Sequence, residues 1–175
     1  MLRNIVKTNI LAVADAKIIA NFLFLAGLSI LIPAFFHIQF ITGPMINAIL
    51  FLSVVLLGRS SALLIGMIPS VIALSFGLLP ALLAPMVPFI MLSNAILIMV
   101  FSWLEKKYWA AVLIASTAKF LFLYFSCSII MDLIFKKELA LKISQILGWT
   151  QLATAILGGI IAFLILKSLK IWQRK

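Results

Sequence analysis

The chain consists of long apolar stretches separated by short groups of basic, proline and glycine residues. Most stretches are long enough for a helix of about 20 residues, which crosses the roughly 30 Å hydrocarbon core of a bilayer. The second stretch is the shortest and rises only about 21 Å as a helix unless residues 38–43 also contribute. The pattern predicts six membrane-spanning helices, at residues 18–36, 44–57, 62–79, 85–104, 109–135 and 148–166.

Residues that break helices are concentrated in the first half of the chain, with all six prolines between positions 33 and 88. Gly43 and Pro44 are expected at the bend before the second helix and in its first turn, where a proline loses no hydrogen bond. Pro85 is expected to begin the fourth helix in the same way. The stretch from His37 to Asn94 is therefore predicted to form one wall and the lid of a cavity between helices.

The composition predicts a single integral membrane domain, residues 1–175. Apolar residues make up 66% of the chain, against 14 basic and 4 acidic residues. So few charges cannot cover the apolar surface of a soluble protein, so lipid is the expected solvent. Asp15 and Lys17 interrupt the first apolar run and no small-residue cleavage pattern follows, so a cleavable signal peptide is not expected.

The distribution of basic residues predicts the orientation in the membrane. With six crossings and the N-terminus inside, ten basic residues fall on the cytoplasmic side and three on the outer side. Without the second crossing, six basic residues would lie on the cytoplasmic side and seven on the outer side. The positive-inside rule therefore favours an all-α bundle of six transmembrane helices with both termini in the cytoplasm. The net charge of +10 is ascribed to membrane anchors rather than to nucleic-acid binding.

Residues for catalysis or for holding a cofactor are scarce. The phosphate-binding loop G-x-x-x-x-G-K-[ST] is absent, and the single histidine excludes paired-histidine haem ligation. Cys127 is the single cysteine, which excludes an internal disulfide, and it lies in an apolar run, so a thiolate metal site is not expected. Asp132 is the only acidic residue in a predicted span, so an intramembrane aspartate pair lacks its second member. We expect no enzymatic activity, no cofactor and no metal.

Isolated polar side chains within the apolar background are the candidate binding residues, because such groups face the bundle interior or a water-filled cavity. Lys119 and Asn94 each lie ten residues from the cytoplasmic end of their helix, so both are expected about 15 Å deep and close together. Ser116, Lys119 and Ser126 share one helical face, which is predicted to turn inward. The expected substrate-binding residues are His37, Gln39, Thr42, Asn47, Asn94, Lys119, Tyr124 and Gln151, of which His37, Gln39, Thr42, Asn47 and Gln151 are placed near the outer surface.

A structural interpretation competes with each of these assignments. A buried lysine can be capped by carbonyl groups, an asparagine can join two helices, and Tyr124 can belong to the interfacial aromatic belt. Small residues also recur at four-residue spacing, which allows helices to approach closely, either within the bundle or against another membrane subunit. They are Ala12, Ala16 and Ala20 on the first helix, and Thr154, Gly158 and Ala162 on the sixth.

The middle of the chain carries Thr42-Gly43-Pro44-x-x-Asn47, Leu57-Gly58-Arg59, Gly66-x-x-Pro69, Gly77-x-x-Pro80 and Pro85-x-x-Pro88. With six predicted crossings and the alanine spacing of the first helix, this layout resembles the S components of energy-coupling-factor (ECF) transporters, which capture vitamins and other micronutrients. The resemblance implies a multi-pass protein of a prokaryotic cytoplasmic membrane. It implies that Ala12, Ala16 and Ala20 contact a transmembrane T component coupled to two ATPases. Substrate would bind near the outer side, beneath the connection between helices 1 and 2.

The sequence thus predicts a substrate-binding subunit of an ATP-driven importer, in which a cationic Lys119 favours an anionic group on the ligand. Two alternatives stay open. A structural or assembly subunit of a membrane redox complex would need no ligand pocket and would use its small-residue faces for docking. An autonomous secondary transporter is disfavoured, because neither repeated halves nor a coupling-ion site is evident.

Overall fold

The computed structural model describes residues 2–36, 38–75, 81–134 and 148–170, and their side chains except those of residues 2–14, 73, 81–83 and 128–134. Every element in this part of the chain is a helix, which confirms the all-helical fold class. The elements are α1 (Leu2–Phe35), α2 (Gln39–Leu57), α3 (Arg59–Ser75), the 3-10 helix η1 (Ala81–Met86), α4 (Val87–Leu104), α5 (Tyr108–Ile134) and α7 (Trp149–Ser168).

Five stretches are long and apolar enough to cross a membrane, namely Asp15–Phe35, Gln39–Leu57, Ala84–Leu104, Tyr108–Cys127 and Trp149–Ser168. Helix α3 is apolar but shorter, and residues 76–79 of the third predicted span lie outside the described residues. Large apolar side chains such as Phe24, Trp103 and Phe125 are exposed on the outside of the bundle, as expected for a surface in contact with lipid. These are the features of a multi-pass membrane protein.

Helix α2 begins at Gln39 rather than at the predicted Pro44, which is its sixth residue. Membrane helices tolerate an internal proline, because neighbouring groups satisfy the backbone that it frees. The 19 residues of α2 rise about 28 Å, enough to cross the hydrocarbon core. Asn47 then lies about 12 Å from the start of the helix, near its middle. The prediction that placed Asn47 near the outer surface was wrong.

Two further helix starts differ from the prediction. Helix α1 begins at Leu2 rather than at residue 18, because residues 2–17 contain neither proline nor glycine to end it. Pro85 lies within η1, and Pro88 instead occupies the first turn of α4. At the other end of the bundle, Gly58 alone joins α2 to α3 with a φ of 84°, a conformation that side-chain-bearing residues adopt rarely.

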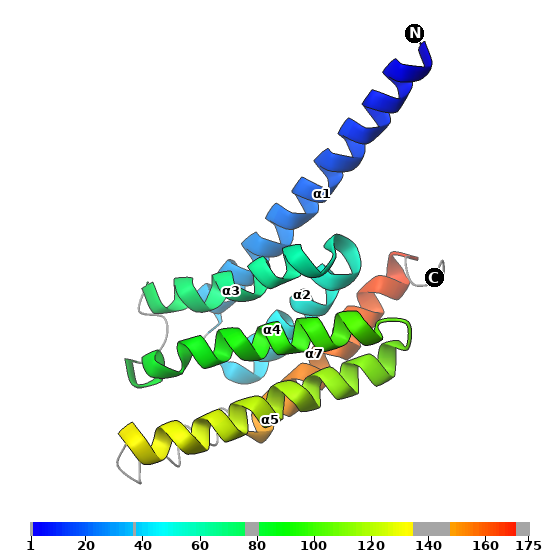
Figure 1. Ribbon diagram of the computed structural model, residues 1–175. Coiled ribbons are helices and arrows are strands. Elements are labelled where there is room, and N and C mark those ends of the chain that lie inside the picture. The colour runs from blue at the N-terminus through cyan, green and yellow to red at the C-terminus, as the bar shows by residue number, and fades with distance from the viewer. Residues whose placement is uncertain (1, 37, 76–80, 135–147, 171–175) are drawn as a thin grey trace.

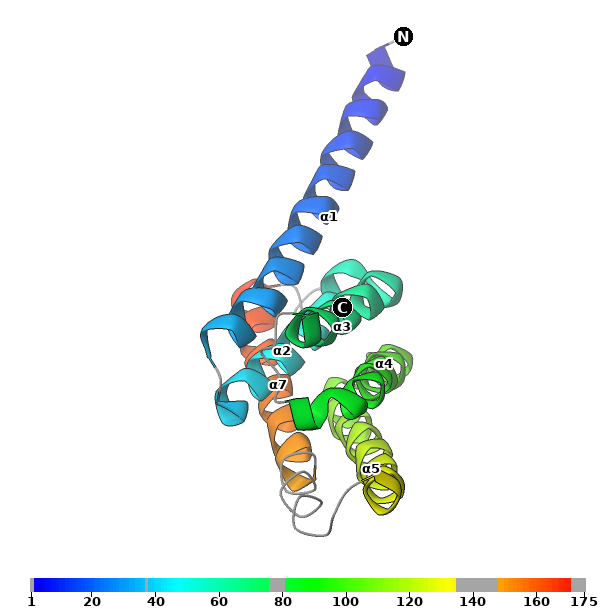
Figure 2. The same ribbon diagram turned by 90° about the vertical axis from the view of Figure 1, so that its left-hand side faces the viewer.

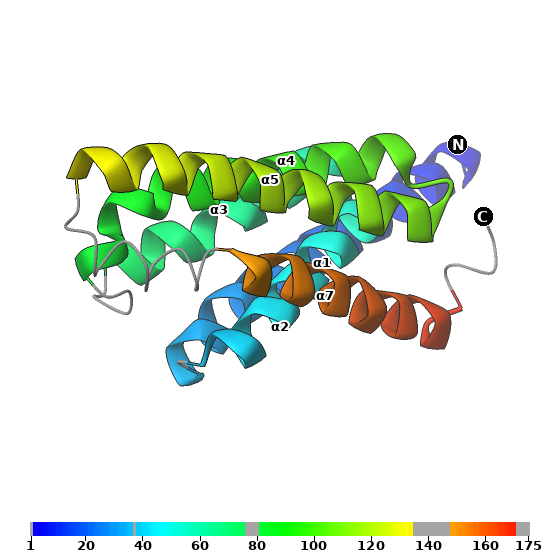
Figure 3. The ribbon, with the colours of Figure 1, turned by 90° about the horizontal axis from the view of Figure 1, so that it is seen from below.

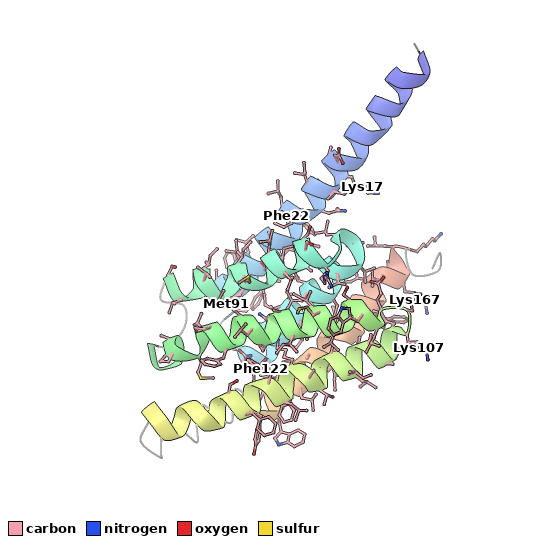
Figure 4. All side chains as sticks on the ribbon, viewed as in Figure 1. Lys17, Phe22, Met91, Lys107, Phe122 and Lys167 are labelled. Carbon is pink, nitrogen blue, oxygen red and sulfur yellow. The ribbon has the colours of Figure 1, made fainter. Side chains whose placement is uncertain are left out.

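Helix α2 is the centre of the bundle, in contact with α1, α3, α4 and α7. Helices α3, α4 and α5 lie side by side, and α7 packs across α2 (Figures 1 and 3). The N-terminal half of α1 extends away from the other helices (Figure 2). Lys107, in the turn between α4 and α5, and Lys167, near the end of α7, lie at the same end of the bundle (Figure 4).

The close approach of α7 to its neighbours depends on two glycines. A Cβ atom added at Gly158 would lie 2.6 Å from Cβ of Asn47 and 2.8 Å from backbone atoms of Pro44 and Ala48, all on α2. One added at Gly159 would collide with Cγ1 of Val112 on α5. The small residues of α7 therefore serve internal packing, one of the two roles considered for them, and Thr154, Gly158 and Ala162 are all buried.

Gly158→Ala is expected to destabilise the protein, because the backbone of α2 would have to move away from the added methyl group. Overpacking of this kind costs about 1–3 kcal/mol, which reversible unfolding in detergent micelles would measure. Gly27→Ala is the matched control in α1, where no atom lies within 4 Å of the added Cβ, and no loss is expected. Equal stability of the two variants would contradict the close contact between α2 and α7.

Candidate functional site

Lys119 lies inside the bundle, in the middle of α5, with only 4% of its surface exposed. Its Nζ donates hydrogen bonds of 2.7 Å to Oδ1 of Asn47 on α2 and of 2.7 Å to Oδ1 of Asn94 on α4. The prediction that Lys119 lies close to Asn94 is confirmed. The predicted inward face of α5 is confirmed at Ser116 and Lys119, which are both buried, whereas Ser126 is partly exposed.

The amide of Asn94 is fixed in its orientation by α3. Its Nδ2 donates a hydrogen bond of 3.1 Å to the backbone carbonyl of Gly66, so its Oδ1 is the atom directed at Lys119. A Cβ at Gly66 would lie 3.6 Å from Cβ of Asn94 and 2.9 Å from Cδ1 of Ile98. The glycine therefore lets α4 approach α3 closely enough for this hydrogen bond.

Asn47 is positioned by α7, because its Cβ lies over the bare backbone of Gly158. Four helices thus assemble the surroundings of the Lys119 amine: α2 and α4 supply side-chain oxygens, α3 orients one of them, and α7 allows the other to be placed. Both asparagines are buried, with 1% of Asn47 and 4% of Asn94 exposed. We call Lys119, Asn47, Asn94 and Ser116 the lysine cluster.

The lysine cluster contains one hydroxyl group without a partner. Ser116 precedes Lys119 by one helical turn, is 0% exposed, and its Oγ makes no hydrogen bond within the described part of the chain. Buried polar groups are nearly always hydrogen-bonded, and one left unsatisfied costs about 1–3 kcal/mol. The sequence placed Ser116 on the inward face but did not identify it as a binding residue, because a missing partner leaves no trace in a sequence.

No acidic side chain in the described regions lies beside the amine of Lys119. Asp15 is exposed on α1, Glu105 lies in the turn that precedes α5, and Asp132 lies about 20 Å further along α5 by helical rise. Two amide oxygens carry only partial negative charge. A buried ammonium group without an anion costs several kcal/mol in an apolar interior. With Lys119 protonated, the lysine cluster would therefore be suited to receive one negative charge.

Two other predicted site residues lie in the first turn of α2, away from the lysine cluster. The hydroxyl of Thr42 donates a 3.2 Å hydrogen bond to the carbonyl of Ile38, and Gln39 is partly exposed. Gln39 is eight residues, or about 12 Å along the helix, from Asn47. Their role in binding stays a prediction, as does that of His37, which lies outside the described residues.

The last two predicted residues differ in burial. Tyr124 is 50% exposed, and its ring packs 5.9 Å from that of Phe120, which in turn lies 5.1 Å from the ring of Trp149 on α7. Trp149 is 74% exposed, so this aromatic group fits the interfacial belt of a membrane protein. Gln151, two residues further along α7, is buried. Its place in the first turn of α7 beside the Phe120–Trp149 contact is compatible with the predicted binding role.

Comparisons with protein-family models, with curated proteins and with solved structures find no match to this chain. The lysine cluster is therefore the feature from which the function is inferred.

Asn47→Ala is expected to destabilise the protein more when Lys119 is present than in a Lys119→Met background, because the single change leaves the buried amine short of an acceptor. A double-mutant cycle, measured by unfolding in micelles, should give a coupling energy of about 1–2 kcal/mol. The same cycle between Asn47→Ala and Lys167→Met should show none, because Lys167 is exposed at the end of α7. Additive effects of Asn47 and Lys119 would contradict the hydrogen bond.

Proposed function

We propose that the chain is the substrate-capturing membrane subunit of an ATP-driven importer of the energy-coupling-factor type, and that it takes up a vitamin or another micronutrient. The observation that carries the proposal is the buried amine of Lys119, held by two asparagines in the middle of an apolar bundle with no described carboxylate partner. Ionisable groups inside a membrane are costly and mark substrate or ion pathways. A ligand with a negatively charged group would pair with Lys119 and so offset the cost of burying its amine in the membrane.

In the proposed topology, α3 also crosses the membrane, which brings the number of crossings to six, and both termini face the cytoplasm. Support comes from the basic residues of the described ends. Lys107 and Lys167 lie together at one end of the bundle (Figure 4), and Arg59, at the start of α3, follows the turn that leads from α2. A concentration of basic residues at one end is the signature of the cytoplasmic side. The membrane proposed is the prokaryotic cytoplasmic membrane.

Substrate is proposed to enter from the opposite, outer end of the bundle. The lysine cluster is buried, so entry requires helices to separate at that end. The elements there include the first turn of α2 with Gln39 and Thr42, the 3-10 helix η1, and the first turn of α7 with Gln151. The 3-10 helix and the prolines beside it interrupt regular helix there, and such irregular backbone is found in membrane proteins where it lines a cavity.

Energy for release is assigned to partner subunits, because the chain has no phosphate-binding loop. We propose that the transmembrane T component docks on the part of α1 that extends from the bundle (Figure 1), where Ala16 and Ala20 are exposed. The side chain of Ala12, the third member of this face, lies outside the described residues. Asp15 and Lys17 are exposed on the same stretch, so the partner surface has to accommodate charge.

An assembly subunit would also dock through small-residue faces. The face on α7 is occupied within the bundle by α2 and α5, which leaves the exposed Ala16 and Ala20 on α1 for that role. The lysine cluster would also have no task in a purely structural subunit, because apolar side chains of similar volume commonly pack as stably as a buried charge.

A panel of vitamins and other micronutrients, screened by thermal unfolding of the purified protein, tests the proposal. At least one compound should raise Tm by a few degrees when present well above its Kd. Lys119→Met should abolish the shift, because it removes the charge while keeping the shape of the side chain. Lys167→Met is the matched control and should leave the shift intact. No shift with any compound, or one that Lys119→Met leaves unchanged, would count against a substrate-binding subunit.

Purification in mild detergent from the native membrane tests the partners. An ATPase pair and a further membrane subunit should accompany the chain, and replacing Ala16 and Ala20 by Phe should release them while leaving the ligand-induced shift in place. Recovery of a redox enzyme instead would favour the assembly role.

A further inference from the structure

We infer that Lys119 and Ser116 together bind a carboxylate group of the captured molecule, an assignment that rests on the proposed function. The ligand is accordingly a monocarboxylate whose charged end reaches the middle of the bundle. The inference draws on two features of the lysine cluster: the unsatisfied hydroxyl of Ser116, and the amine of Lys119, which in its protonated form has one further N–H and one positive charge.

The hydroxyl of Ser116 departs from the behaviour of the other fully buried serines. Ser29, Ser53 and Ser93 each donate to a backbone carbonyl three or four residues earlier in the same helix, at 2.7 Å. Such back-bonding is the usual way in which a serine within a helix satisfies its hydroxyl. Ser116 is equally buried, yet its Oγ has no partner in the described part of the chain. A ligand oxygen would supply the missing partner.

In its protonated form, the amine of Lys119 has one N–H left for the same ligand. An ammonium group carries three donors, and Asn47 and Asn94 accept two of them. Long side chains on a helix lean toward its N-terminus, over the preceding turn. This preference would direct the Lys119 amine toward the turn that contains Ser116. One N–H and one O–H on the same buried face match the two oxygens of a carboxylate.

The charge of the cluster selects a monoanion. Lys119 is the only buried basic side chain in the described part of the chain, and Lys107 and Lys167 lie at the end of the bundle. A carboxylate neutralises one ammonium group completely. A phosphate ester, with about −1.5 to −2 charges at neutral pH, would leave excess negative charge in an apolar interior, where charge is costly. A neutral amide of the same shape would leave Lys119 unbalanced.

Pairs of compounds that differ only at this group provide the test, with the purified full chain in detergent or lipid nanodiscs. The pairs are nicotinate and nicotinamide, benzoate and benzamide, and hexanoate and hexanamide, each at millimolar concentration. We expect at least one carboxylate to raise Tm by about 3 °C, with no effect of its amide. Ser116→Ala should reduce the apparent affinity about tenfold, and Lys119→Met should abolish the shift.

Thr117→Val is the matched control for Ser116→Ala, because Thr117 is the next residue of α5, is exposed, and bonds only the carbonyl of Leu113. Its shift should equal that of the wild type. Each comparison uses the ligand-induced change in Tm of a variant that retains a cooperative unfolding transition, so that differences in basal Tm are subtracted.

Three results would overturn the inference. They are equal shifts from acid and amide, an unchanged carboxylate shift in Ser116→Ala, and no shift with any carboxylate. If a neutral micronutrient still stabilises the protein in a Lys119-dependent manner, the substrate-capturing role stands and the carboxylate assignment alone fails. If no compound of either set stabilises the protein, both fail.

Discussion

The two hydrogen bonds that Lys119 donates to Asn47 and Asn94 are the constraint on which the rest of the bundle depends. An amine in the middle of an apolar bundle has few possible acceptors, so α2 and α4 must each present an oxygen at the same point. Asn47 reaches that point because α2 packs directly on the backbone of Gly158. Asn94 presents Oδ1 to Lys119 because its Nδ2 donates a hydrogen bond to the carbonyl of Gly66. The polar site therefore depends on the close helix contacts that position Asn47 and Asn94.

The lysine cluster surrounds an amine with neutral groups and leaves the hydroxyl of Ser116 without a partner, which distinguishes it from a structural ion pair. A structural pair would place a carboxylate beside the amine and satisfy every hydroxyl around it. Here the described residues offer two amide oxygens and an unsatisfied Ser116. Bound ligand would complete the pairing, and its removal would restore an uncompensated charge. In the proposed importer, this difference would give a physical reason for a partner subunit to drive release, since the empty site would favour refilling from the proposed outer side.

The sequence predicted the parts of the site that depend on helix length and missed those that depend on the backbone. Lys119 and Asn94 were placed at one depth because the basic turn at residues 105–107 marks the ends of both helices. The depth of Asn47 was wrong because Pro44 was taken as a helix start, whereas membrane helices accommodate proline internally. The carbonyl of Gly66 belongs to the backbone and carries no side-chain signal. The spacing of small residues along α7 predicts that another helix can approach closely. It does not predict which helix does so, because that depends on the tertiary structure.

An experimental structure of the protein purified with its bound substrate tests most directly whether Lys119 is a ligand-binding group. The prediction is a non-protein group within hydrogen-bonding distance of both Nζ of Lys119 and Oγ of Ser116, with the hydrogen bonds to Asn47 and Asn94 retained. A structure in which substrate lies elsewhere, while protein groups and water alone satisfy Lys119 and Ser116, would contradict it.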